Sequence, residues 1–157
     1  SVINGLNKVE SDYFCIFDGD GSFNSDDIFK MKKKIDENYD FVFASRYVNG
    51  EISEDDDVFS KFGNFFFTKI VRILFNINTS DVLFLYVLGK KDNIKKINLV
   101  QKDYSICSEF IIKAYKNFKC TEILSKERKR LHGQSKVNKV LAGLTLFINI
   151  IKLRKNN

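Results

Sequence analysis

Short apolar runs alternate along the chain with stretches in which apolar residues recur every three or four positions. An apolar run bounded by turn residues is typical of a buried strand, and the longer repeat is typical of a helix with one buried face. Strands are therefore predicted at residues 13–17, 40–44, 82–88 and 121–124. Helices are predicted from Ser25-Asp26-Asp27 onward and at residues 59–75, 92–98, 106–118 and 138–153.

The alternation of strands and helices predicts an α/β fold with a mostly parallel sheet flanked by helices. We expect the strands at residues 13–17 and 40–44 to be neighbours in this sheet. Ligands of such sheets bind at the carboxyl ends of the strands, and Asp18, Asp20 and Arg46 fall there.

The composition is that of one folded domain. The chain has 157 residues, of which 44% are apolar and 14% aromatic, which suffices for a hydrophobic core. No apolar stretch reaches the ~18 residues of a membrane-spanning helix. Cys15, Cys107 and Cys120 form no CxxC pair, which argues against a zinc ribbon and a disulfide framework. The cysteine usage suits a reducing compartment, so we expect a cytoplasmic protein.

Charge is distributed unevenly between the two parts of the chain. Residues 1–60 carry 14 acidic and 6 basic side chains, whereas residues 61–157 carry 6 acidic and 20 basic ones. A basic half indicates an anionic partner, such as nucleic acid, a phosphorylated small molecule or an anionic membrane surface. A solvated basic surface would explain the charge equally well.

An acidic, glycine-containing loop, Asp18-Gly19-Asp20-Gly21-Ser22, directly follows the first predicted strand. Two carboxylates this close can hold one Mg²⁺ or Mn²⁺ ion, which completes its shell with water and substrate phosphates. An EF-hand loop would need Gly where Phe23 stands and Glu where Phe29 stands. The alternative to a metal–diphosphate site is a plain acidic turn.

Two basic segments could bind phosphate. The loop from Lys126 to Lys136 places Arg130 and Lys136 on either side of a Gly-X-Ser turn, and such cations can clamp an anion. Arg46 ends the second predicted strand near the acidic loop. For both segments a solvated or ion-paired basic surface is the alternative.

Taken in order, these segments resemble the family 2 glycosyltransferases, in particular the polyprenyl-phosphate branch that includes dolichol-phosphate mannose synthase. The resemblance is carried by the following stretches: Asp18-Gly19-Asp20-Gly21-Ser22, Ser25-Asp26-Asp27-Ile28, Ser45-Arg46-Tyr47, the Asn64-centred helix before Ser80-Asp81, Ser108-Glu109-Phe110, and Arg130-Leu131-His132-Gly133-Gln134-Ser135-Lys136. The last stretch is similar to the family's Arg-X-X-Gly-X-Ser-Lys signature. After Ser80-Asp81 the chain departs from the family, because Leu85-Tyr86-Val87 lacks the basic residue usual there.

The resemblance implies a partial GT-A fold, with residues 1–137 as the C-terminal two-thirds of the domain and 138–157 as an amphipathic helix with a basic tail. It implies a nucleotide-diphospho-sugar donor, a polyprenyl-phosphate or glycan acceptor, and a divalent cation at Asp18 and Asp20. The implied donor-binding residues are Asp18, Gly19, Asp20, Arg46, Arg130 and Lys136. The implied acceptor or phosphate-clamp residues are Arg46, Lys61, Ser135 and Lys136. The family's base-binding N-terminal portion is absent, so an upstream part is expected to be missing.

The resemblance also implies which residues take part in catalysis. Asp20 would act through the cation that stabilises charge on the leaving phosphate. A phosphate acceptor needs no base, whereas a hydroxyl acceptor would need a carboxylate base, for which Asp81 and Glu109 are candidates. The alternative for Asp81 is a capping or turn residue, and the alternative for Glu109 is a carboxylate that interacts with the dipole at a helix N-terminus.

The final helix has about a dozen apolar residues between cationic ones, which fits peripheral contact with a membrane face through residues 138–155 as well as simple packing on the sheet. Two other functions remain as alternatives: a non-catalytic module that binds nucleic acid or a phospholipid surface, and an inactive truncated fragment. Nucleic acid is not the expected partner, because the aromatic residues fall on apolar helix and strand faces rather than among the basic ones.

Overall fold

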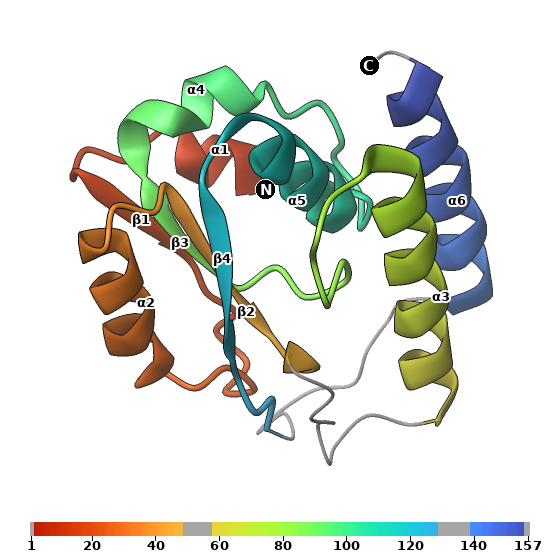
Figure 1. Cartoon of the computed structure of the whole chain (residues 1–157), viewed down its shortest axis with the longest axis horizontal. Coiled ribbons are helices and arrows are strands. Elements are labelled where there is room, and N and C mark those ends of the chain that lie inside the picture. Colours follow the sequence, from red (N-terminus) through yellow and green to blue (C-terminus); the bar gives the residue numbers. More distant parts are fainter. Residues whose placement is uncertain (1, 49–57, 129–138, 156–157) are drawn as a thin grey trace.

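The computed structural model describes residues 2–48, 58–128 and 139–155 (Figure 1). Four strands form one sheet in the order β1-β3-β2-β4. Their bounds are Tyr13–Ile16 for β1, Phe41–Ser45 for β2, Val87–Lys90 for β3 and Cys120–Leu124 for β4. The helices are α1 (Val2–Leu6), α2 (Asp27–Asp36), α3 (Val58–Phe75), α4 (Ile94–Ile97), α5 (Ile106–Asn117) and α6 (Lys139–Lys155), with a 3-10 turn at Lys91–Asn93.

The prediction of a mostly parallel sheet is wrong, and so is the prediction that the first two strands are neighbours. The third strand, β3, lies between β1 and β2 and is antiparallel to both, and in the described part of the chain only β2 and β4 pair in parallel. The strands β1, β2 and β4 nevertheless share one direction. Their carboxyl ends, and therefore the residues after β1 and β2, still meet at one edge of the sheet.

The third strand is also shorter than predicted and shifted along the chain. Residues 82–86 form no strand, although Val82, Phe84 and Tyr86 are buried. Val82 packs in the core that contains α3, whereas Phe84 and Tyr86 pack with Phe23 and with residues of α2. Their burial thus comes from packing of a connecting segment, so an apolar run here does not mark a strand. The backbone of this segment is held in part by Thr68 of α3, whose hydroxyl accepts a hydrogen bond from the Val82 N–H at 3.3 Å.

The sheet has a different helical layer on each face (Figure 1). Alternate residues of β2 point to opposite sides, as in any strand. Phe41 and Phe43 belong to the larger core formed with α3, α5 and α6. Val42 and Ala44 belong to a smaller core formed with Met31 and Ile35 of α2 and with Phe23. Helices therefore cover both faces of the sheet. The loops that carry the candidate site lie at the carboxyl ends of the strands.

Gly89 in β3 allows aromatic rings to pack directly over the sheet. A Cβ atom at this position would lie 2.4 Å from a ring carbon of Phe41 and 2.8 Å from one of Phe14. These two rings meet edge to face, with centroids 6.1 Å apart. The strand between β1 and β2 thus needs a residue without a side chain at this point.

Candidate active site

The acidic loop follows β1 directly. Asp18 lies at the surface and Asp20 is half-buried. The Asp20 Oδ1 atom accepts a hydrogen bond from the Ser22 N–H at 3.0 Å, which closes a tight turn. Gly21 has a φ of 85°, a backbone conformation that favours glycine. Both carboxylates are consequently carried on one compact turn at the carboxyl edge of the sheet.

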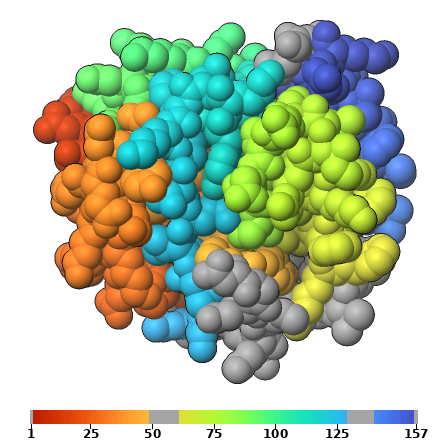
Figure 2. Space-filling model, viewed as in Figure 1, coloured from red at the N-terminus to blue at the C-terminus, as the bar shows by residue number. Residues whose placement is uncertain are grey.

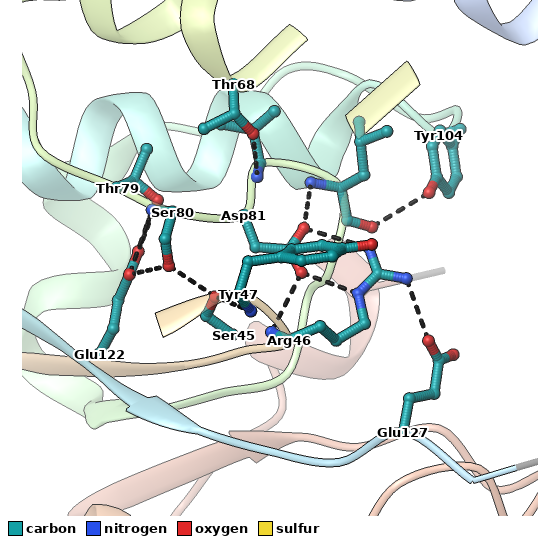
Figure 3. Close-up of polar contacts among 12 residues, drawn as sticks. Ser45, Arg46, Tyr47, Thr68, Thr79, Ser80, Asp81, Tyr104, Glu122 and Glu127 are labelled. Carbon is teal, nitrogen blue, oxygen red and sulfur yellow. Dashed lines mark hydrogen bonds and ion pairs between the residues drawn. The ribbon is translucent and has the colours of Figure 1, made fainter. Parts of the chain in front are cut away.

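Arg46, which follows β2, is held by a buried carboxylate (Figure 3). Its Nε atom donates to Asp81 Oδ2 at 2.8 Å and its Nη2 atom to Asp81 Oδ1 at 3.1 Å. The Arg46 N–H and the Leu83 N–H also donate to this carboxylate. Only 1% of Asp81 and 8% of Arg46 are exposed. The structure therefore unites two predicted site residues in one bidentate ion pair, the geometry in which Arg and a carboxylate bind best.

The other side of the Arg46 guanidinium contacts Glu127, with Nη1 3.0 Å from Glu127 Oε2. The guanidinium carbon also lies 4.9 Å from the ring centre of Phe84 and 5.3 Å from that of Tyr47. These contacts fix both the position and the plane of the guanidinium group. Arg46 is thus a rigid cation whose charge is shared with two carboxylates.

A second polar network lies beside the first and fastens the segment that contains Asp81 (Figure 3). The Glu122 carboxylate of β4 accepts hydrogen bonds from the Thr79 hydroxyl at 2.6 Å and from both the N–H and the hydroxyl of Ser80. The Ser80 hydroxyl is also 2.6 Å from that of Ser45 at the end of β2. Residues 79–81 are therefore tied to both β2 and β4.

Residues 125–128 connect the end of β2 with the acidic loop. The Ser125 N–H donates to the Ser45 carbonyl at 2.9 Å, and the Arg128 N–H donates to the Ser22 carbonyl at 2.8 Å. The Arg128 Nη2 atom lies 3.3 Å from Asn24 Oδ1. The basic loop thus begins directly beside the loop of Asp18 and Asp20.

Cys107 lies in the first turn of α5 and is buried. Burial, together with the negative charges of Asp18 and Asp81, raises the pKa of its thiol to about 12. The thiol is therefore protonated at neutral pH.

The remaining predicted site residues lie elsewhere or outside the described part of the chain. The fully buried Glu109 carboxylate accepts from the Val100 N–H at 3.1 Å, the Gln101 N–H at 2.8 Å and the Lys113 Nζ atom at 2.7 Å. It therefore holds the connection between α4 and α5. Lys61 is half-buried in the first turn of α3. Arg130, Ser135 and Lys136 lie outside the described residues.

The acidic loop carries two carboxylates, the ligand type that a hard divalent cation takes. Within residues 2–48, 58–128 and 139–155, no group of three or more His, Cys, Asp or Glu side chains could hold a metal ion. Magnesium often keeps one or two carboxylates and completes its shell with water and substrate phosphate oxygens. Asp18 and Asp20 match this requirement in ligand type.

Sequence reasoning missed Glu122 and Glu127, which complete the two networks. One signal was present: residues 61–157 contain only 6 acidic side chains against 20 basic ones, and Glu122 stands in a short strand. A lone acidic residue in a basic region suggests a specific partner. The partners themselves lie 42 and 81 positions away and could not be read from the local pattern.

The structure thus places the acidic loop and the Arg46–Asp81 ion pair at the carboxyl ends of β1 and β2, on either side of β3 in a mixed sheet. The sequence profile of glycosyl transferase family 2 matches residues 1–97. The chain belongs to this family, and its fold is accordingly of the GT-A type. The match spans Asp18, Asp20, Arg46 and Asp81 but ends before Glu109 and the basic loop.

No match was found among curated proteins. Family membership identifies the chain as glycosyltransferase-like, with a sugar donor and an acceptor in general terms. None of the helices in the described ranges is long and apolar enough to traverse a bilayer.

Proposed function

We propose that the protein transfers a sugar from a nucleotide-diphospho-sugar to a polyprenyl phosphate or a related phosphate acceptor, with a divalent cation at Asp18 and Asp20. The observation that carries this proposal is the common location of the acidic loop and the Arg46–Asp81 pair at the carboxyl edge of the sheet, in a chain that belongs to glycosyl transferase family 2.

Breaking the bond between sugar and diphosphate leaves negative charge on the outer phosphate. A cation held by Asp18 and Asp20 would supply positive charge where this negative charge develops. Arg130 and Lys136 would add cationic donors, and the backbone contact between Arg128 and Ser22 supports this role, because it starts the basic loop beside the acidic one. Arg46 would remain paired with Asp81, and its positive charge would contribute to the electrostatic potential of the donor site.

The hydrogen bonds of the candidate bases favour an acceptor that is already anionic. Asp81 accepts from Arg46 and Leu83 through both carboxylate oxygens. Glu109 likewise accepts from Val100, Gln101 and Lys113. A carboxylate has about four acceptor positions, and these groups have filled most of theirs. A phosphate acceptor attacks without losing a proton to a base, which is consistent with this arrangement.

The metal assignment is tested with Asp20→Asn. This change removes one charged ligand but retains the side-chain oxygen that accepts from Ser22. Transfer of radiolabelled sugar to polyprenyl phosphate in detergent should fall at least ~100-fold, on the scale of losing one charge-stabilising group. Asp26→Asn is the matched control, because Asp26 is an exposed acid nearby and should keep full activity. Turnover that survives a chelator unchanged would refute the assignment.

The phosphate-clamp assignment is tested by position within the basic loop. Arg130→Ala and Lys136→Ala should each remove ~2–3 kcal/mol of transition-state stabilisation, measured as kcat/KM. Lys129→Ala changes the same charge before the glycine turn and should cost under ~1 kcal/mol. Equal losses for all three variants that vanish in high salt would mean that the loop is only a basic surface.

A further inference from the structure

Helices α3 and α6 expose large apolar side chains on the sides that do not face the core. On α3, Phe62 is 68% exposed and Ile73 70% exposed, while the neighbouring Val71 is fully buried. On α6, Leu146 and Ile150 are buried, and the opposite side is apolar as well. The exposed apolar set comprises Phe62, Phe65, Phe66 and Ile73 of α3 and Val140, Leu141, Leu144, Phe147 and Ile148 of α6.

The two exposed rows belong to neighbouring helices. A Cβ atom at Gly143 of α6 would lie 3.8 Å from the ring of Phe67 of α3, so the helices approach closely there. They run side by side along one end of the molecule, away from β1 (Figure 1). In the space-filling view, α3 forms a bulging part of the right-hand surface, with α6 at its edge (Figure 2). We call the nine exposed residues together the α3–α6 face.

The charges on these helices are of one sign. Neither α3 nor α6 contains an Asp or Glu residue. Exposed cations accompany the apolar rows, with Lys69 and Arg72 on α3 and Lys152, Arg154 and Lys155 at the end of α6. Within these two helices the apolar side chains are accompanied by cations and by no acid, although acidic residues precede α3 at positions 51–57. The helices themselves match an anionic lipid surface, which offers hydrocarbon beneath negatively charged headgroups.

Single exposed apolar residues are ordinary on protein surfaces, but nine on two helices that contact each other are typical of an interaction site. We propose that the α3–α6 face docks on the surface of a membrane that contains anionic phospholipid. The face would lie in the headgroup region with Phe62, Phe66, Leu144 and Phe147 inserted among the acyl chains. The sequence pattern indicates membrane contact only for the final helix, whereas the structure adds the exposed apolar side chains of α3.

The experiment is flotation of the full chain with vesicles of phosphatidylcholine alone and with vesicles of equal parts phosphatidylcholine and phosphatidylglycerol. We expect binding to the anionic vesicles and at most weak binding to the neutral ones. The double variant Phe62→Ser/Leu144→Ser should reduce the partition coefficient about ten-fold or more, since each side chain loses apolar burial in the membrane. Phe29→Ser is the matched control, because Phe29 is 72% exposed on α2 and should keep wild-type binding.

The contribution of the cations to vesicle binding is tested with separate variants. Arg72→Gln should reduce binding to anionic vesicles about five-fold, as expected for one cation near a charged lipid surface. Lys33→Gln removes an exposed charge from α2 and should leave binding unchanged. Far-ultraviolet circular dichroism of each variant checks that the helices are retained.

The proposal is overturned if the wild-type chain does not float with anionic vesicles, or if Phe29→Ser lowers binding as much as Phe62→Ser/Leu144→Ser. A concentration-dependent dimer that is lost in the double variant, without vesicle binding, would assign the face to a second copy of the chain and also overturn it. No sugar nucleotide is present in these measurements. Their failure would therefore leave the proposed transferase activity untouched, and failure of transferase assays would not affect the docking result.

Discussion

At the scale of single residues, the Arg46–Asp81 pair determines how the site is built. Removing one partner of a buried pair leaves an uncompensated charge, which typically costs 3–5 kcal/mol. Asp81→Asn should therefore lower the free energy of unfolding by about 3 kcal/mol, measured by urea denaturation. Asp36→Asn is the control, because its pair with Lys32 is exposed and should be worth under ~1 kcal/mol. Similar losses in the two variants would contradict a structural role for the buried pair.

At the scale of elements, β3 depends on Gly89, over which the rings of Phe14 and Phe41 pack. Gly89→Ala forces a methyl group into this space and should destabilise the fold by about 1–3 kcal/mol, as overpacked cores do. Gly63→Ala on α3 meets nothing within 4 Å and should stabilise the fold by ~0.5–1 kcal/mol, because alanine is the better helix former. Thermal and urea denaturation of the two variants check the opposite signs. A neutral Gly89→Ala would mean that the rings move aside.

Most elements could be predicted from local pattern, but their arrangement could not. Strands predicted at residues 13–17, 40–44 and 121–124 are confirmed as β1, β2 and β4 to within a residue at most ends. The prediction at residues 82–88 was wrong except at its last two positions, because burial there comes from packing of a loop. Nothing local indicates that β3 inserts between β1 and β2, since this depends on contacts between distant segments.

For the site, residue types could be predicted from sequence but pairings could not. Asp18, Asp20 and Arg46 follow predicted strands, and Asp81 is indicated by the family resemblance at Ser80-Asp81. That Asp81 binds Arg46 rather than an acceptor depends on the path of residues 76–86, which no pattern specifies. Their individual roles in transfer stay predictions.

At the scale of the whole molecule, Asp40 links the stability of the sheet to pH. Its carboxylate accepts from Lys90 of β3 at 3.2 Å and from the Lys119 N–H before β4 at 3.1 Å. Partial burial acts to raise the pKa of Asp40, but the hydrogen bonds from Lys119 and Lys90 outweigh it and the pKa is lowered. In the unfolded chain this carboxyl binds a proton more readily. The stabilisation is therefore complete above the ordinary pKa of ~4 and is lost as pH falls through the lowered value.

Asp40→Asn removes this group and should flatten the acid side of the stability curve. Between about pH 5 and pH 3 the urea midpoint of the wild-type chain should fall more steeply than that of the variant. Glu10→Gln serves as the control, since Glu10 is an exposed acid and should leave the slope unchanged. Parallel curves for Asp40→Asn and wild type would show that this carboxyl does not couple folding to protonation.

The position of β3 between β1 and β2 has a consequence for how the protein is made. Among the described residues β1 pairs only with β3, so Tyr13 pairs with Lys90 and Ile16 with Val87 across a large part of the chain. While a ribosome synthesises the intervening residues, Phe14 and Phe41 have no strand to cover them. Such long-range pairing slows folding and leaves apolar surface open to association. Synthesis of β3 should therefore allow β1 and β2 to be joined, whereas Phe41 is covered fully only after Phe110 and Phe118 have been made.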